Sequence, residues 1–138
     1  MNVVFADSFY FFALLNPRDA AHVRAGAFAN SYRGRLVTTA WVLAELGDGL
    51  CAPPDRGSFG RLLDKFETNP FWYLLPPSGD TFRAGTDLYR SRHDKGWSLT
   101  DCLSFVVMQR MGISDALTAD RHFVQAGFRA LLAKEGEP

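Results

Sequence analysis

Four acidic residues lie where one expected secondary-structure element gives way to another: Asp7, Glu45, Asp101 and Asp120. Each closes or borders an apolar run of the sequence. A divalent metal ion that serves phosphodiester chemistry is held mainly by carboxylate oxygens. If the fold brings these four side chains together, the sequence predicts a metal-dependent site of that kind.

Helix capping is the simpler explanation for three of these acids. Asp7 and Asp120 each precede an expected helix, where an aspartate side chain can accept a backbone N–H. Ser98 and Asp101 have the spacing of a capping box. Glu45 is harder to explain in this way, because the apolar residues around it indicate a largely buried helix, and buried acids are rare unless they are paired or bound to a metal.

The electrostatics of a carboxylate cluster favour a bound cation. Two carboxylates about 5 Å apart repel by roughly 3 kcal/mol at an effective dielectric constant near 20. Magnesium, or manganese, suits an all-oxygen set of ligands better than zinc, since no His or Cys shows the spacing of a zinc site. His122 is adjacent to this region in sequence, and we expect it to serve in capping and packing rather than as a general base.

Strands alternate with helices along the whole chain, which is typical of parallel βαβ units in one domain spanning residues 1–138. The carboxyl ends of parallel strands share one edge of the sheet, so Asp7 and Asp120 should lie together there. We expect strands at 2–6, 35–38, 71–75 and 113–118, with a weak one at 128–132. We expect helices at 9–15, 19–32, 40–50, 58–68, 80–93, 98–111 and 120–126, with a loop at 53–57.

Composition narrows the class of protein. The chain has 138 residues, 47% of them hydrophobic, with 15 basic and 15 acidic side chains and hence no net charge. Such a chain does not coat polyanions without selectivity. Cys51 and Cys102 form no CxxC motif, and no stretch is typical of a secretory signal or a membrane span. We therefore expect a cytoplasmic protein with reduced thiols and no membrane association.

The four acids also stand in motifs that resemble those of the PIN-domain family, specifically the VapC-type toxin ribonucleases of bacterial toxin–antitoxin systems. The first strand and its acid read VVFADS, and the helix with a central glutamate reads TAWVLAEL. The third acid lies in SLTDCLSF, and the most specific motif is ALTADRHF, with Gly127 and Phe128 shortly after it. These motifs in this order cover nearly the whole chain.

The resemblance implies a three-layer α/β/α sandwich and a magnesium-dependent endoribonuclease, with manganese as an alternative ion. It implies that Asp7 and Asp101 are the principal metal ligands and that Glu45 and Asp120 complete the acidic site. Ser8 and Thr118 would hydrogen bond to these ligands. Whether one or two metal ions act stays open.

The resemblance also implies partners. The basic residues Arg90, Arg92 and Lys95 could bind RNA phosphates, but a solvated helix end is the simpler interpretation. Trp97 could stack on a base, but a packing role is the simpler interpretation. A toxin requires a cognate antitoxin, which could place an amphipathic helix in an apolar groove walled by residues 19–32 and 40–50. Toxins of this type commonly form homodimers.

Other classes of protein fit the sequence less well. A phosphatase of the haloacid-dehalogenase type needs a second aspartate two residues after the first, where this chain has Phe9. A phosphoacceptor receiver domain needs paired acids and a late lysine at a strand end, and the expected strand ends of this chain offer no such lysine. Two alternatives within the PIN-like class stay open, namely a non-toxin nuclease of RNA processing or decay and a catalytically silent binding module.

Overall fold

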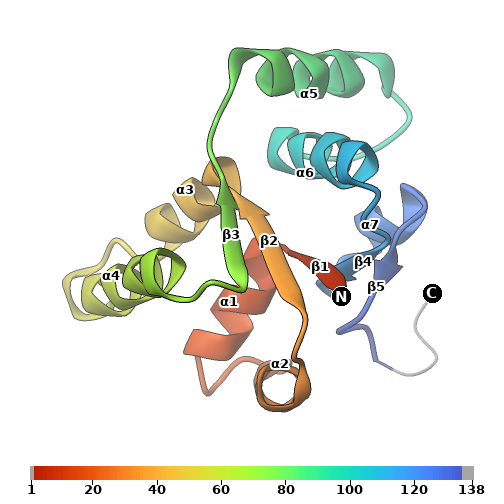
Figure 1. Cartoon of the computed structure of the whole chain (residues 1–138). Helices are drawn as coiled ribbons and strands as arrows, with labels where there is room; N and C mark the ends of the chain where they lie inside the picture. The colour runs from red at the N-terminus through yellow and green to blue at the C-terminus, as the bar shows by residue number, and fades with distance from the viewer. Residues whose placement is uncertain (1, 135–138) are drawn as a thin grey trace.

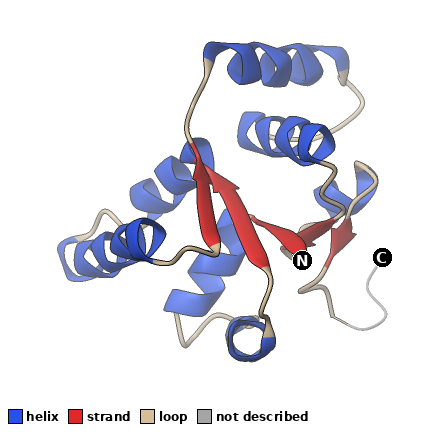
Figure 2. Cartoon of the chain, viewed as in Figure 1, coloured by secondary structure: helices blue, strands red, loops and turns tan. Residues whose placement is uncertain are grey.

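A computed structural model describes residues 2–134. Its centre is a sheet of five strands in the order β3-β2-β1-β4-β5, and every pair of neighbours is parallel. The strands are β1 (Val3–Ala6), β2 (Arg35–Thr39), β3 (Trp72–Leu75), β4 (Asp115–Leu117) and β5 (Arg129–Ala130). Figure 2 shows helices around these strands.

Seven helices connect and cover the strands. They are α1 (Ser8–Leu15), α2 (His22–Ser31), α3 (Ala40–Gly49), α4 (Pro53–Thr68), α5 (Gly79–Ser91), α6 (Leu99–Met111) and α7 (Arg121–Gln125). Because parallel crossovers are right-handed, α1–α4, which connect strands added on one side of β1, lie on one face, and α5–α7, which lead to the strands on the other side, lie on the opposite face. Figure 1 shows this arrangement, and the expected α/β/α sandwich with a parallel sheet is confirmed.

The strand order has a switch point at β1. The chain passes from β1 outward through β2 to β3, and then returns to place β4 on the other side of β1. Phe5 of β1 is therefore aligned with Val37 of β2 on one side and with Ala116 of β4 on the other. In open parallel sheets, ligands bind at such a switch point beyond the carboxyl ends of the strands.

The core lies on both faces of β1, which is the central strand. Phe5 and Ala6 are completely buried, as are Phe11 of α1 and Phe123 of α7. On one face, the ring of Phe11 packs 6.0 Å from that of Trp72, measured between ring centroids. Burial of large aromatic side chains such as these removes much apolar area from water and stabilises the fold.

Two helix starts differ from the sequence prediction. The expected loop at 53–57 is the beginning of α4, because Pro53 occupies the first turn, where the missing N–H of proline needs no partner. The second helix starts at His22 rather than at residue 19, because the carboxylate of Asp19 accepts the N–H of Ala21 and forms a turn there. Both differences lie away from the acidic residues.

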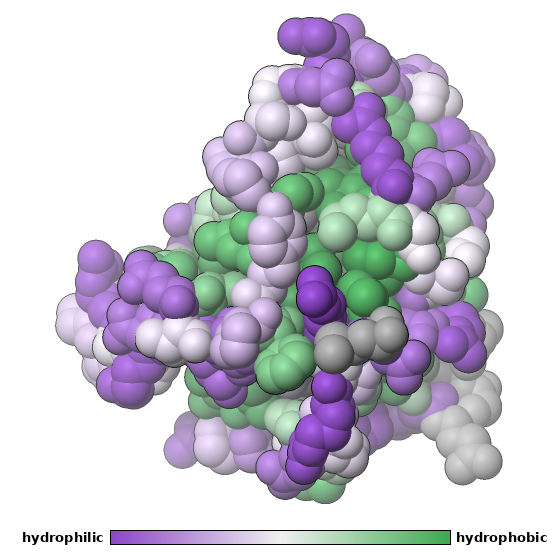
Figure 3. Space-filling view, in the orientation of Figure 1, coloured by the Kyte–Doolittle hydropathy of each residue, from purple (hydrophilic) through white to green (hydrophobic). Residues whose placement is uncertain are grey.

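In the view of Figure 3, hydrophobic residues gather at the centre, and hydrophilic residues surround them. The exposed aromatic side chains of the structure include Phe71, Tyr73 and Phe82. Within residues 2–134, no helix combines the length and the hydropathy needed to cross a bilayer.

Gly85 of α5 is buried where α5 packs on α6, and it allows the close approach of the two helices. A Cβ at this position would lie 2.8 Å from Cγ of Leu103 and even closer to its Cδ2. We expect Gly85→Ala to lower the free energy of unfolding by about 1–3 kcal/mol through overpacking. Chemical denaturation measures this change.

Gly26, in the middle of α2, provides the matched control. A Cβ there meets no atom within 4 Å. Gly26→Ala should therefore raise the free energy of unfolding by about 0.5–1 kcal/mol, since alanine is the better helix former. Equal effects of the two substitutions would contradict the packing that is described here for Gly85.

Candidate active site

The acidic residues gather at the switch point of the sheet, beyond the carboxyl ends of β1 and β4. Asp7 directly follows β1, and Thr118 directly follows β4. Helix α3 carries Glu45 from one face of the sheet and α6 carries Asp101 from the other, and these two helices contact each other. The parallel sheet thus places groups from four separate segments around one point.

The side chain of Asp7 is fixed by a hydrogen bond, but it does not cap a helix. It occupies the position before α1, yet its side chain makes no capping hydrogen bond. Instead, the hydroxyl of Thr118 donates to Oδ2 of Asp7 at 2.9 Å, and both residues are buried. The capping explanation is therefore wrong for Asp7, and its carboxylate is directed toward the end of β4.

Asp101 and Asp120 do cap helices, and they belong to the cluster as well. Asp101 forms the expected capping box, because Oδ2 accepts the N–H of Ser98 at 3.1 Å and the Ser98 hydroxyl accepts the N–H of Asp101. Oδ1 of Asp120 accepts the N–H of His122 at 2.9 Å at the start of α7. Each cap uses only part of the capacity of a carboxylate, so oxygen lone pairs are left for a cation.

Glu45 is exposed, and the expectation of a buried glutamate is therefore wrong. Its helix is apolar on the side facing the sheet, where Val42 and Leu46 are fully buried, whereas Glu45 points to the cavity at the sheet edge. The hydroxyl of Ser8 donates to Oε1 of Glu45 at 2.5 Å. This hydrogen bond links α1 to α3 and orients the carboxylate.

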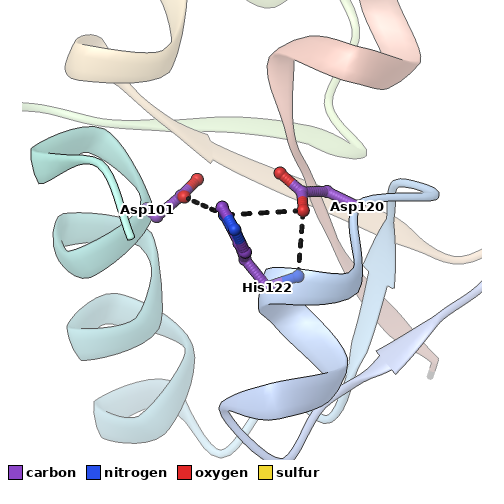
Figure 4. A group of neighbouring side chains, drawn as sticks. All are labelled: Asp101, Asp120 and His122. Carbon is purple, nitrogen blue, oxygen red and sulfur yellow. Dashed lines mark hydrogen bonds and ion pairs between the residues drawn. The ribbon is translucent and has the colours of Figure 1, made fainter. Parts of the chain in front are cut away.

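His122 is the residue of the site that the sequence argument missed. Its Nδ1 lies 3.0 Å from Oδ2 of Asp101 and 3.5 Å from Oδ1 of Asp120 (Figure 4). Ligand atoms of these three residues lie within 4.8 Å of one another, so they could share a metal ion. The expectation that His122 serves only in capping and packing is thus wrong for its ring.

The sequence carried only a weak signal for His122. The residue stands in the first turn of the helix that Asp120 caps, which places its backbone near the acids but leaves the direction of its ring open. Carboxylates still dominate the cluster, and a set dominated by oxygen suits magnesium or manganese.

These groups line one cavity of about 410 Å³. Its walls include all four acids, together with the following neighbours: Ser8, Phe9, Phe12, Gly96, Ser98 and His122. Thr118 lies behind the wall, since it is fully buried and acts through Asp7. The structure therefore brings together Asp7, Glu45, Asp101 and Asp120, as the sequence predicted.

The electrostatics of Asp7 favour a cation in this cavity. Burial raises the pKa of Asp7 to about 7, and the charges of Asp101 and Glu45 also raise it, while hydrogen bonds from Thr118 and the Ser8 backbone lower it. A carboxylate in this position gains stability from a nearby positive charge, which offsets both the burial and the repulsion. The donor set and the cavity thus suit a divalent metal ion.

Removing the Thr118 hydroxyl tests this account of Asp7. We expect Thr118→Val to raise the pKa of Asp7 above its value of about 7, because a hydrogen bond that favours the charged carboxylate is lost. An NMR titration of the carboxyl carbon in the metal-free protein measures the change. Thr118→Ser retains the hydroxyl and is the control, and an unchanged pKa in the valine variant would refute the assigned role.

The expected RNA-binding residues lie beside the acids and not among them. Arg90, Arg92 and Lys95 line a second cavity, which shares Gly96 with the acidic one. Trp97 is buried, and its indole N–H donates to Gln125 at 3.1 Å, so the packing interpretation of this tryptophan is confirmed.

The apolar groove differs from the one expected. The structure has a cavity of about 430 Å³ beside α3, but its other wall is α4 and not α2. Leu43 and Ala44 line it from α3, and Arg56 and Phe59 line it from α4. The expected walls at 19–32 and 40–50 are thus half wrong, because residues 53–57 are helical and extend α4 alongside α3.

Comparison with known proteins agrees with this fold. No curated protein matches the chain. Among solved structures, Mycobacterium tuberculosis VapC20, described as a sarcin–ricin loop cleaving toxin, is similar with a TM-score of 0.81 and 23% identity, over 91% of this chain and 96% of that one. FitAcB from Neisseria gonorrhoeae is similar with a TM-score of 0.67 and 18% identity, over 92% of this chain and 95% of that one.

At these identities the two likenesses establish the fold. The family is established by the sequence itself, because the model of the PIN domain matches residues 4–129. The matched range contains all four acids and every strand except the first residue of β1 and the last residue of β5. The chain therefore belongs to the PIN domain family.

Proposed function

We propose that this protein is a metal-dependent endoribonuclease that hydrolyses RNA phosphodiester bonds with Mg²⁺, or with Mn²⁺ in its place. The observation that carries the proposal is the convergence of four carboxylates on one cavity, where burial and neighbouring charges hold the pKa of Asp7 at about 7. Repulsion between these carboxylates would destabilise a purely structural cluster, whereas a bound cation would offset the repulsion.

The chain's own residues would prepare the site for the ion. Thr118 fixes Asp7, Ser8 fixes Glu45, and the Ser98 N–H fixes Asp101, so each carboxylate is oriented before a ligand arrives. We assign Asp7 and Asp101 as the principal ligands and Glu45 and Asp120 as the acids that complete the site. A bound Mg²⁺ lowers the pKa of a coordinated water and neutralises charge on the phosphate.

His122 adds a positioning role in this proposal. An ionised carboxylate can only accept a hydrogen bond, so the Nδ1 of His122 donates to Asp101 across 3.0 Å. Side chains that hold metal ligands in this way are typically worth 10- to 100-fold in metal affinity or activity. The histidine would therefore orient Asp101 through Oδ2, the same oxygen that accepts the N–H of Ser98.

We further propose that the ribonuclease is the toxin of a toxin–antitoxin pair. The fold is shared over nearly the full length of both chains with VapC20, which is described as a toxin that cleaves the sarcin–ricin loop. The groove between α3 and α4 is lined by apolar side chains and could accept an amphipathic helix of a cognate antitoxin. A homodimer is the expected assembly.

Cleavage of RNA by the purified protein tests the proposed activity. We expect RNA to be cut in the presence of Mg²⁺ or Mn²⁺ and to stay intact in excess chelator, because the acids alone repel the phosphate. Gel analysis of a labelled RNA measures the result. Cleavage that persists in chelator would contradict the metal-dependent mechanism, and a lack of cleavage with every divalent ion would favour a silent binding module.

A further inference from the structure

The segment between α5 and α6 carries a second cavity that the acidic site does not use. This cavity has a volume of about 440 Å³ and is lined by four basic side chains, Arg90, Arg92, His93 and Lys95, together with Tyr89, Gly96, Trp97 and Cys102. None of these lining residues is a carboxylate. The acidic and the basic cavity therefore have opposite charge.

The two cavities are neighbours along one stretch of chain. Gly96 lines both of them. From there, Ser98 and Asp101 face the acidic cavity, while Trp97 and Cys102 face the basic one. A Cβ on Gly96 would meet no atom within 4 Å, so a ligand with one phosphate beside the acids has open space at this glycine to extend toward the basic cavity.

The basic side chains of this cavity differ in whether a carboxylate neutralises them. Arg92 is held by two hydrogen bonds to Asp94, at 2.9 and 3.0 Å, and its guanidinium lies 4.9 Å from the ring centroid of Trp97. Asp94 thus balances the charge of Arg92, and the guanidinium of Arg92 is fixed against Trp97 in the wall of the cavity. Within residues 2–134, no carboxylate lies at ion-pair distance from Arg90 or Lys95.

The two aromatic side chains of this cavity, Tyr89 and Trp97, also differ in how accessible they are to a ligand. Trp97 is 6% exposed, and its ring is enclosed by Arg92 on one side and by Phe105, 5.0 Å away between ring centroids. It therefore offers no face to a base. Tyr89 is 53% exposed at the rim, so its ring is open for stacking.

We propose that the basic cavity holds one nucleotide of single-stranded RNA adjacent to the scissile phosphate, with Arg90 and Lys95 as its phosphate ligands and Arg92 as a positioning residue. This inference rests on the proposed ribonuclease activity. Pockets of about 300–1,000 Å³ hold small ligands, so a cavity of about 440 Å³ fits a single nucleotide. Recognition of unpaired nucleotides through phosphates and an aromatic ring is common for RNA-binding proteins.

The test combines two substrates. The double variant Arg90→Ala/Lys95→Ala should raise KM for a single-stranded RNA by about tenfold or more and change kcat much less, because ground-state binding is lost. Its metal-dependent hydrolysis of bis(p-nitrophenyl) phosphate should be unchanged, since this small diester needs only the acidic cavity. Arg83→Ala, an exposed arginine on the same helix, is the matched control and should leave both activities unchanged.

Salt dependence separates phosphate binding from a structural effect. RNA affinity is measured by fluorescence anisotropy in an Asp101→Asn background, which prevents cleavage. The slope of log affinity against log salt should decrease by about 0.7 for each phosphate contact that is lost. Arg90→Lys should retain most of the slope.

Each outcome bears on a different part of the argument. An RNA that binds and is cut equally well by the double variant would overturn the basic cavity and leave the ribonuclease intact. A blunt duplex that competes as well as the single strand would overturn the assignment to single-stranded RNA. A wild-type protein that cuts neither substrate, but whose RNA binding depends on Arg90 and Lys95, would overturn the activity and support the cavity.

Discussion

Asp101→Asn is expected to lower metal-dependent RNA cleavage by roughly a hundred- to a thousandfold while the protein stays folded. The substitution removes a negative charge from the wall of the acidic cavity. It retains an oxygen that can accept the N–H of Ser98, so the capping box and the start of α6 are preserved. The loss of activity should therefore come from the site and not from the scaffold.

The measurement is cleavage rate under metal saturation, with circular dichroism and thermal unfolding as checks of the fold. Asp87→Asn removes one negative charge from an exposed position on α5 and is the control, for which we expect wild-type rates. Cleavage that survives in a folded Asp101→Asn protein would remove Asp101 from the metal site. Expression of the active protein and of this variant in cells would also separate a toxin, which should arrest growth, from a nuclease that does not.

Asp7→Asn is expected to stabilise the metal-free protein near neutral pH, by at most about 4 kcal/mol. Burial raises the pKa of Asp7 from 3.8 to about 7, and each pKa unit corresponds to about 1.4 kcal/mol. The asparagine side chain has no charge to bury and can still accept the hydrogen bond from Thr118. A residue that we assign as a principal metal ligand is thus expected to destabilise the metal-free fold.

The sign of the pH dependence follows from proton binding. Between pH 4 and 7, the folded protein retains a proton on Asp7 that the unfolded chain has lost, so the free energy of unfolding of the wild type falls as pH rises. This contribution to the slope is absent in Asp7→Asn. Below pH 4 the two proteins should be nearly equal in stability, and their difference should be largest above pH 7.

Urea denaturation in chelator at a series of pH values measures the difference, again with Asp87→Asn as the control. Metal addition should stabilise the wild type, and more strongly at higher pH, because the ion competes with the proton on Asp7. The asparagine variant should lose most of this response. If the free energy of unfolding had the same pH dependence in the wild type and in Asp7→Asn, the raised pKa of the buried Asp7 would be contradicted.

Together, these two results would distinguish a functional cluster from a structural one. When an acid stabilises the fold, neutralising it makes the protein less stable. The Asp7→Asn protein is instead expected to be more stable than the wild type and less active. Asp101 is expected to lose activity with little change in stability, since its cap is kept. A structural carboxylate network would show the opposite pattern in both variants.

The broad architecture could be predicted from the sequence, because it depends on local patterns. Buried strands of four or five residues followed by amphipathic helices predict a parallel sheet, and a parallel sheet places Asp7 at a defined edge. The weak last strand was also found, as the two-residue β5. Short-range capping signals were harder to use, since Asp101 and Asp120 cap helices and line the cavity, while Asp7 stands at a cap position without capping.

Glu45 shows where a local pattern misleads. Its apolar neighbours predicted burial, but they point to the core while the glutamate points to the cavity edge and is exposed. The hydrogen bond that orients it comes from Ser8, which is 37 residues away in the sequence. A contact of this range depends on how α1 and α3 pack, and no spacing within either helix contains it.

The sequence by itself thus determined which residues follow a strand and which lie on the helices between strands, and with that the four candidate acids. Tertiary structure alone decided the partners of those acids: the Thr118 hydroxyl, 111 residues from Asp7, and the ring of His122, 21 residues from Asp101. It also decided that the basic residues form a cavity of their own beside Gly96. The physical reason is that the order of residues fixes their place along a strand or helix, whereas the direction of a side chain and its pKa depend on segments that meet only when the chain is packed.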